Sequence, residues 1–349
     1  MYWFVPGFVV SMNRIGIMVN VVSKVDKLQT MVIVVVLMLV GHGFSKADTI
    51  SDNGLWALPR VSVACVREHP GHASELGTQV VMGTPLKVIS RDGDWIRIET
   101  PEGYKGYVID NSLQMMGASD MDRWRDAARV SVCSIDQTYV YCQNEDSSIA
   151  SRLCDVVNGC VLELLADFNE SDGNELVPVR LPDGREGCIK SADIVKMDEL
   201  AFRSCSKQDV LLFAEMMMGT PYLWGGTSSK SMDCSGLTKI SYFSQGVILP
   251  RNASQQARVG CAVDASDYNA FVPGDLLFFG NNNTGRINHV GLYVGDGRFI
   301  HCSGHVKINS LRPSDADYLP LSLLSVRHLT DDDMRGFSIG CHSWYFTNR

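Results

Sequence analysis

A cysteine at the start of a predicted helix is the candidate nucleophile of this chain. Cys234 opens an apolar-periodic segment that runs to Gly246, and Asp233 before it is a good N-cap residue. In the first turn of a helix, free N–H groups and the helix dipole favour a thiolate over a thiol. Because most free cysteines are small buried hydrophobes, a catalytic role for Cys234 also requires a base nearby.

Two histidines on a predicted β-hairpin can supply the base and the group that orients it. His289 begins one predicted strand and His301 ends the next, with the strong hairpin signal Gly295-Asp296-Gly297 between them. If these three residues form the loop, Gly291 lies opposite His301, and the imidazoles are diagonal neighbours on one face, roughly 7–8 Å apart between Cα atoms. A loop one residue longer or shorter would put them on opposite faces. Either histidine alone is more often structural, but the pair, following a capped cysteine, favours catalysis.

The elements that must position these residues can be predicted around them. The segment 206–219 predicts a helix, because an approximate capping box begins it and apolar residues repeat at helical spacing. The segments 274–279, 289–294 and 298–301 predict strands. The cysteine is thus expected on a helix and both histidines on strands.

The N-terminal half of the chain is rich in short predicted strands and contains an internal repeat. The segment 100–108 aligns with 181–189, an offset of 81 residues that is about the length of one small β-barrel. Two tandem units over about 58–116 and 129–196 fit this pattern, with 119–130 as a helical or irregular linker.

Length, charge and cysteine spacing restrict the class of protein. With 349 residues the chain is too long for one ordinary core, and two or three domains are expected. A net charge of −8 and a pI near 5.5 argue against a nucleic-acid partner. The eleven cysteines contain no CxxC pair, which argues against a zinc site. Disulfides among Cys133, Cys142, Cys154 and Cys160 are one alternative after export, and unpaired packing is the default.

An apolar run near the N-terminus predicts export. The run 31–40 follows Lys24 and Lys27 and precedes the small-x-small pattern Ser45-Lys46-Ala47, which together are typical of a secretory signal. The run is shorter than the ~20 apolar residues that a membrane span needs. We therefore expect a targeting segment over 1–47 and no stable membrane span in the mature protein, with a longer anchor as the alternative.

Five motifs in the second half of the chain resemble those of the NlpC/P60 cysteine peptidases, in the same order over about 205–330. The resemblance implies a papain-like α+β fold and hydrolysis of the γ-D-glutamyl–diamino acid bond of peptidoglycan stem peptides. It implies Cys234 as nucleophile, His289 as base and His301 as the third, orienting member, and we expect no cofactor and no metal ion. The motifs are Asp233-Cys234-Ser235-Gly236-Leu237, Leu249-Pro250-Arg251-Asn252-Ala253-Ser254-Gln255-Gln256, Pro273-Gly274-Asp275-Leu276-Leu277-Phe278-Phe279, His289-Val290-Gly291-Leu292-Tyr293 and Ile300-His301-Cys302-Ser303-Gly304.

The same resemblance assigns residues to the substrate. The Pro-Tyr-x-Trp-Gly-Gly motif implies that the Tyr222 hydroxyl and the backbone N–H of Cys234 hold the oxyanion. Asp233 and Ser235 are expected to face the substrate as well. Aromatic packing is the alternative for Tyr222, and an N-cap role alone would explain Asp233.

The two β-rich units resemble bacterial SH3 modules of cell-wall enzymes, the second less closely because it has Cys188 where the first has Tyr107. Two such units before an NlpC/P60 domain resemble the dipeptidyl-peptidase VI type of recycling enzyme, in which the first unit contacts a free N-terminal L-alanine. The matching candidates are Glu75 and Tyr107, because a buried ammonium needs a carboxylate. A solvated loop carboxylate and a core tyrosine are the alternatives.

These observations combine into one predicted organisation: a targeting segment (1–47), two SH3-like domains (48–118 and 119–200) and a peptidase domain (201–349). The predicted function is an exported cysteine endopeptidase, in the periplasm or cell envelope, that cleaves the γ-D-glutamyl–L-diamino acid bond of muropeptides beginning with L-Ala. The alternatives are a hydrolase of polymeric peptidoglycan, a catalytically silent wall-binding protein, and an acyltransferase or amidase on the same fold. The choice between lysine and diaminopimelate stays open.

Overall fold

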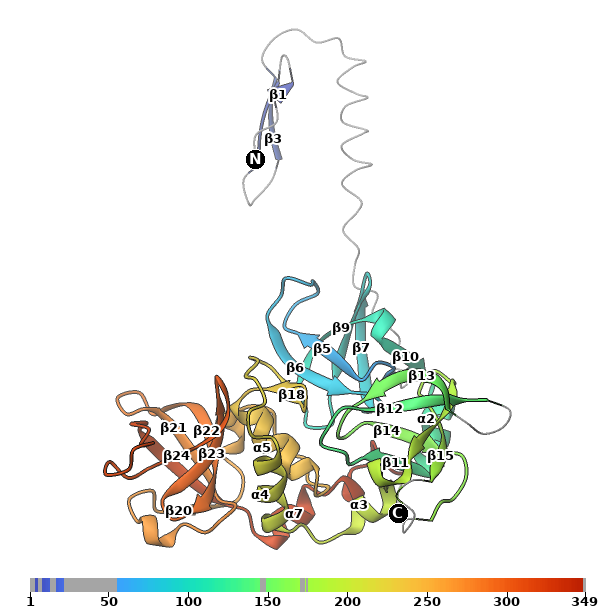
Figure 1. Cartoon of the computed structure of the whole chain (residues 1–349). Helices are drawn as coiled ribbons and strands as arrows, with labels where there is room; N and C mark the ends of the chain where they lie inside the picture. The colour runs from blue at the N-terminus through green and yellow to red at the C-terminus, as the bar shows by residue number, and fades with distance from the viewer. Residues whose placement is uncertain are drawn as a thin grey trace, which may run out of the picture. The chain divides into compact units, whose positions relative to one another are not determined.

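The computed structural model divides the chain into two units, residues 1–46 and 47–349. In the first unit it describes only the backbone of three strands in one sheet, β1 (Phe4–Val5), β2 (Phe8–Met12) and β3 (Ile17–Val21). In the second unit the described residues are 55–144, 149–169, 173 and 175–347 (Figure 1). The apolar run 31–40 and Ser45-Lys46-Ala47 lie outside the described residues, so the targeting segment stays a prediction. Across the described part of the chain, no helix is both long enough and apolar enough to span a membrane.

The second unit begins with a seven-stranded antiparallel sheet. Its strands alternate between inward and outward side chains: Ile96 and Ile98 are fully buried, whereas Arg97 between them is exposed. The strands are arranged in the order β10-β4-β7-β8-β9-β5-β6. They are β4 (Trp56–Pro59), β5 (Val63–Arg67), β6 (Leu76–Val81), β7 (Leu86–Asp92), β8 (Trp95–Glu99), β9 (Lys105–Ile109) and β10 (Leu113–Met116).

A second sheet repeats this arrangement. Its seven strands lie in the order β17-β11-β14-β15-β16-β12-β13, which is the first order with each strand replaced by its counterpart in the second copy. The repeat predicted from the sequence is therefore present in the backbone, and the identification of the second copy as an SH3-like domain stays a prediction. The strands are β11 (Arg129–Val132), β12 (Thr138–Gln143), β13 (Ile149–Val156), β14 (Val161–Leu164), β15 (Leu176–Arg180), β16 (Glu186–Lys190) and β17 (Ile194–Lys196).

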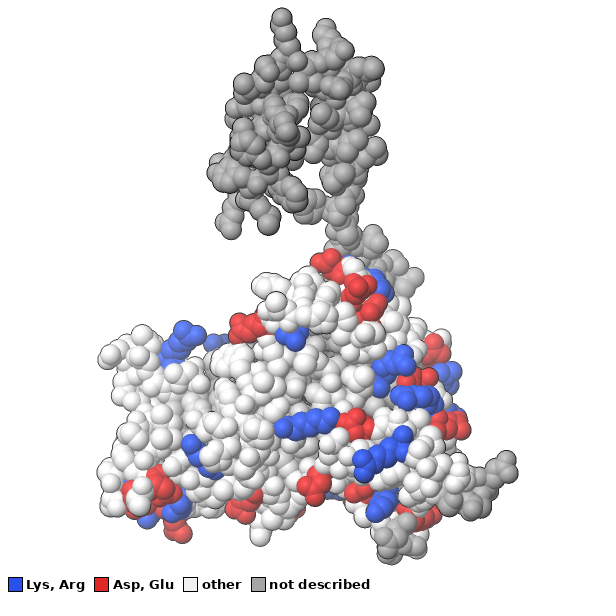
Figure 2. Space-filling view, turned by 45° about the horizontal axis from the view of Figure 1, so that its top comes forward, with Lys and Arg blue, Asp and Glu red and all other residues white. Residues whose placement is uncertain are grey.

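Short helices connect the sheets to each other and to the rest of the chain. The predicted linker contains α2 (Ala118–Asp126), whose Met121 and Trp124 are buried. After the second sheet, α3 (Met197–Phe202) leads to the third part of the unit. Figure 2 shows Lys and Arg side chains interspersed with Asp and Glu side chains on the face in view.

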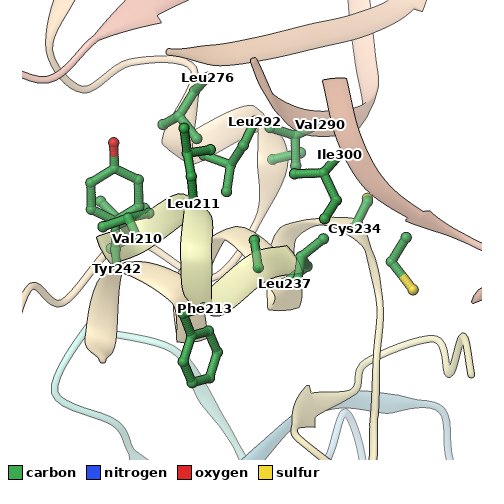
Figure 3. Close-up of a cluster of buried hydrophobic side chains, with 14 of the residues drawn as sticks. Val210, Leu211, Phe213, Cys234, Leu237, Tyr242, Leu276, Val290, Leu292 and Ile300 are labelled. Carbon is green, nitrogen blue, oxygen red and sulfur yellow. The ribbon is translucent and has the colours of Figure 1, made fainter. Parts of the chain in front are cut away.

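The third part is a six-stranded antiparallel sheet with helices packed on one face, and it carries all three candidate catalytic residues. The strand order is β20-β25-β21-β22-β23-β24. In Figure 3, Val210 of α4 and Leu237 of α5 lie among Leu276, Leu292 and Ile300 of the sheet, within one buried apolar cluster. The elements are α4 (Lys207–Met216), β18 (Thr227–Ser228), β19 (Ser231–Met232), α5 (Cys234–Phe243), α6 (Ala253–Gln256), β20 (Cys261–Val263), β21 (Leu276–Asn281), β22 (Arg286–Gly295), β23 (Arg298–Ser303), β24 (His305–Ser310), β25 (Leu323–His328) and α7 (Asp331–Gly336).

The helix and strand predictions are confirmed in position and corrected at their ends. Ser206 caps α4 by accepting the backbone N–H of Asp209 at 3.2 Å, as the capping pattern predicts. Helix α5 ends at Phe243, three residues before the predicted Gly246, because a turn with positive φ at Gly246 follows it. All eleven cysteines are free thiols, so the disulfides considered from the sequence are not formed.

The hairpin that carries both histidines has the predicted register but a different loop. Gly295 pairs with Arg298, so the loop contains two residues, not three, and Asp296 in it has a φ of 50°. A register shift between Tyr293 and Gly295 compensates for the shorter loop. On the side of this bulge away from the loop, the two strands pair in the register that a three-residue loop would give.

Candidate active site

Cys234 is the first residue of α5, and its thiol lies against the strand that carries His289. The carboxylate of Asp233 accepts the backbone N–H of Gly236 at 2.7 Å, which makes Asp233 the N-cap residue expected from the sequence. Cys234 is 8% exposed, and the backbone N–H of Val290 donates a hydrogen bond to its thiol. Val290 directly follows His289 on β22, so Cys234 lies near the backbone of the strand at the candidate base, and contact between its thiol and the His289 ring stays a prediction.

His289 and His301 lie on the same face of the sheet and contact each other. Nε2 of His289 and Nδ1 of His301 are 2.8 Å apart, and the two rings are nearly perpendicular, at 89°. Gly291 lies on β22, two residues after His289 and on the same face of the sheet. A Cβ atom there would approach the Phe299 ring to 2.8 Å and the Cβ of His301 to 3.2 Å, so glycine leaves the space in which the two imidazoles meet.

Asn309 contacts the ring of His301 and thereby determines which nitrogen of each histidine carries the hydrogen. Its Nδ2 donates to the carbonyl oxygen of Asp317 at 2.7 Å, so its Oδ1 faces Nε2 of His301 at 2.9 Å. Because an amide oxygen only accepts, Nε2 of His301 carries the hydrogen and its Nδ1 accepts from His289. The unprotonated nitrogen of His289 is therefore Nδ1, which is free to take the proton of a thiol.

Burial keeps both reacting groups neutral. Burial, together with the charge of Asp233, raises the pKa of Cys234 to about 11. Burial, together with His301 beside it, lowers the pKa of His289 to about 4. The helix N-terminus was expected to favour a thiolate, but desolvation outweighs it here. At rest Cys234 is therefore a thiol and His289 a neutral imidazole, and the predicted catalytic roles require His289 to take the proton of the thiol.

The acid limb of the pH–rate profile is expected to lie well below the pKa of an ordinary histidine. With its pKa lowered to about 4, His289 stays neutral, and therefore basic, as the solution is acidified towards pH 5. We expect kcat/KM, which reports ionisations of the free enzyme, to change by less than about twofold between about pH 5.5 and 7. Circular dichroism at each pH controls for unfolding. An acid limb centred near 6.5, the ordinary histidine value, would contradict this assignment.

Tyr222 lies close enough to Cys234 for a thiolate there to disfavour ionisation of its phenol. Burial, together with negative charge on Cys234 and Asp233, raises the pKa of its hydroxyl to about 12. The phenol therefore keeps its proton at neutral pH and can donate to an oxyanion. The oxyanion role of Tyr222 stays a prediction.

Asp233 and Ser235 are buried and are engaged within the protein. Asp233 is 6% exposed, and its Oδ2 accepts the backbone N–H of Gly225 at 3.0 Å. The hydroxyl of Ser235, which is 5% exposed, donates to Oδ1 of Asp233 at 3.1 Å. These contacts stabilise the start of α5, and direct contact of either residue with substrate stays a prediction.

The first sheet is joined to the loop that precedes Cys234. Nε1 of Trp224 donates to Oε1 of Glu75 at 2.8 Å. Gln79 on β6 binds this loop more firmly: its Oε1 accepts the backbone N–H of Thr227 at 3.0 Å and the hydroxyl of Ser228 at 3.1 Å. The first sheet therefore stands next to the Tyr222–Ser228 loop, and Glu75 is one of the residues that joins them.

The two tyrosines of this region have different surroundings. Tyr107 lies on β9, with its ring centre 6.0 Å from the guanidinium carbon of Arg97. Tyr104 donates its hydroxyl hydrogen to Glu68, and its pKa, raised above the usual range first by burial, also responds to the charges of Arg251 and Glu75. Tyr104 is thus the tyrosine that the fold brings to the side of Glu75, and the sequence analysis did not single it out.

Comparisons with known proteins identify two kinds of domain in this chain. Residues 219–319 match the model of the NlpC/P60 family, and residues 62–114 match that of the bacterial SH3 domain. The chain is 29% identical over 245 residues to a gamma-D-glutamyl-L-lysine dipeptidyl-peptidase of Bacillus cereus, covering 66% of this chain and 68% of the relative. It is 28% identical over 248 residues to dipeptidyl-peptidase 6 of Lysinibacillus sphaericus, covering 69% and 86%.

A solved structure shares the fold over most of the chain. A crystal structure of an NlpC/P60 family protein from Bacillus cereus aligns with a TM-score of 0.65 at 23% identity, covering 78% of this chain and 99% of that one. The alignment therefore extends beyond the peptidase domain. The family matches show that this chain has a bacterial SH3 domain followed by an NlpC/P60 domain, and together with the relatives above they identify it as a cysteine peptidase.

Proposed function

We propose that this peptidase hydrolyses the γ-D-glutamyl–L-diamino acid bond of muropeptides that begin with a free L-Ala. The observation that carries the proposal is the joint between the first sheet and the peptidase domain, which places Glu75 against Trp224 in the loop before Cys234. The names of the two relatives given above, both dipeptidyl-peptidases, support a substrate recognised at its amino end. The proposed location is the periplasm or cell envelope.

The proposed mechanism relies on the hydrogen bonds that join His289, His301 and Asn309. Nδ1 of His289 takes the proton of Cys234 as the sulfur attacks the γ-carbonyl carbon, which gives a tetrahedral oxyanion. The backbone N–H of Cys234 and the hydroxyl of Tyr222 donate to that oxyanion. His289 then passes the proton to the departing amine, and water releases the acyl group from sulfur. His301 keeps His289 in the required tautomer throughout.

The proposed amine site is formed by the first sheet. A substrate ammonium needs a carboxylate where it leaves water, and Glu75 and Glu68 supply two. Tyr104, whose hydroxyl donates to Glu68 and whose ionisation is disfavoured by the nearby charge of Glu75, is proposed as the tyrosine of this site. The role first assigned to Tyr107 stays a prediction.

Mass spectrometry of the products tests the proposed function directly. The peptides are L-Ala-γ-D-Glu-L-Lys, its N-acetylated form and the diaminopimelate counterpart. The proposal predicts release of L-Ala-γ-D-Glu from the free peptides and little or no cleavage of the acetylated one. Equal cleavage of the acetylated peptide, or faster release from intact sacculi than from free peptide, would favour a hydrolase of polymeric wall instead.

Glu75→Gln is expected to weaken binding of free-amine substrates selectively. A hydrogen bond to a charged group contributes about 1.5 kcal/mol or more, so KM for L-Ala-γ-D-Glu-L-Lys should rise about tenfold with little change in kcat. Steady-state kinetics provides the measurement. Glu99→Gln, a change on β8 of the same sheet, is the matched control and should leave KM as it is. An unchanged KM in Glu75→Gln would exclude the amine role.

A further inference from the structure

Arg251 has a buried guanidinium that joins the two domains at the start of the nucleophile helix. The residue is 2% exposed, and it lies in the loop between α5 and α6. Nη1 and Nη2 donate to the two carboxylate oxygens of Asp233 at 3.1 and 2.5 Å, and Nη1 also donates to the hydroxyl of Ser235 at 2.8 Å. Nε donates to Oγ1 of Thr78 at 2.8 Å. A cation removed from water stays in place only if such partners compensate for its lost hydration.

The ion pair acts on the nucleophile through Asp233. A carboxylate at the N-cap orders the first turn of α5, but its negative charge also disfavours a thiolate on the next residue. Asp233 raises the pKa of Cys234 and Arg251 lowers it, so the guanidinium counteracts the effect of the capping carboxylate on the thiol. The other titratable groups that face Cys234 are His289, Cys302 and Tyr222. All three are neutral at pH 7, because their pKa values are moved to about 4, 12 and 12.

Of the acceptors named above for the Arg251 guanidinium, the Thr78 hydroxyl is the one that belongs to the SH3 domain. It is fully buried on β6 of the SH3 domain, 173 residues from Arg251 in the chain. The neighbouring Gln79 fixes β6 to Thr227, with the Thr227 hydroxyl donating to the carbonyl oxygen of Gln79 at 2.8 Å. The position of the Thr78 hydroxyl is therefore set by the docking of the SH3 domain.

We propose that Arg251 is a positioning residue for Cys234 and that Thr78 of the SH3 domain completes its hydrogen bonds. In this arrangement, docking of the SH3 domain holds the guanidinium against the N-cap carboxylate and so makes the thiol reactive. The SH3 domain contributes to the chemistry of the thiol as well as bordering the substrate. The inference rests on the proposed role of Cys234 as the nucleophile.

The test measures the reactivity of the thiol without any substrate. The full chain is treated with iodoacetamide at pH 8, and the rate of modification at Cys234 is followed by peptide mass mapping, which separates it from the other ten cysteines. An opposite charge nearby shifts a pKa by about one unit or more, so Arg251→Met should react about tenfold more slowly. Arg251→Lys, which keeps the charge, should restore part of the rate. Thr78→Val, which removes the hydroxyl and keeps the size of the side chain, should slow modification severalfold and lower kcat more than it raises KM.

Lys230→Met is the matched control for breaking a contact between domains. Lys230 donates to Ser62 at 3.1 Å and to Asp155 at 2.5 Å, and this change should leave the Cys234 rate unaltered. Circular dichroism and thermal unfolding establish that each variant is folded. The proposal would be overturned by a folded Thr78→Val protein that keeps the wild-type rate of Cys234 modification and the wild-type kcat. This outcome decides the question even if Arg251→Met does not fold. Activity that persists in Cys234→Ala would instead refute the proposed function, and the alkylation rates would still decide the role of Arg251.

Discussion

Cys234→Ala is expected to lower kcat by about 10⁴-fold or more, because the remaining groups of the site cannot form the acyl intermediate. Cys302→Ala is the matched control. Cys302 belongs to the same buried cluster and is fully buried, but its thiol donates to the carbonyl oxygen of Met232 at 3.2 Å and lies on β23 instead of at a helix start. We expect Cys302→Ala to retain kcat within a few-fold. Steady-state release of L-Ala-γ-D-Glu gives both values, and the reverse ranking would exclude Cys234 as the nucleophile.

His301→Leu is expected to lower kcat by about 10²- to 10⁴-fold, with a small effect on KM. Leucine cannot accept the hydrogen from Nε2 of His289, so the ring can turn, or exchange tautomer, and present a protonated nitrogen to the thiol.

Two graded variants separate this explanation from simple loss of packing. His301→Gln keeps an acceptor near the same place and should recover at least about tenfold of the lost kcat. Asn309→Leu removes the contact that selects the tautomer of His301 and should fall between the wild type and His301→Leu. Equal activity of His301→Gln and His301→Leu, both folded by circular dichroism, would show that hydrogen bonding at this position does not assist catalysis.

The parts of the site that sequence reasoning predicted depend on local signals. Asp233 was predicted as a cap because its side chain reaches a backbone N–H three residues later. The shared face of His289 and His301 followed from strand periodicity and a turn signal only a few residues away. The predicted loop was one residue too long. The β-bulge next to the loop gives the strands the register that the longer loop would have produced.

The parts that sequence reasoning missed are contacts between distant segments. Thr78 and Arg251 are 173 residues apart, and Gln79 and Thr227 are 148 apart, so neither pairing follows from local propensity. Asn309 has no motif of its own, and its role appears only when β24 is placed beside β23.

The protonation state of Cys234 was also not predictable. The helix N-terminus is visible in the sequence, whereas burial depends on the whole fold, and burial decides the result here.

A trapped acyl-enzyme tests the central claim most directly. The enzyme is mixed with L-Ala-γ-D-Glu-L-Lys, quenched in acid during turnover and digested, and the peptides are analysed by mass spectrometry. The account predicts an L-Ala-γ-D-Glu acyl group on the peptide that contains Cys234, and its absence from the same digest of His289→Ala. Turnover with the acyl group on another residue, or rapid-quench data with turnover but no covalent adduct at any time, would contradict it.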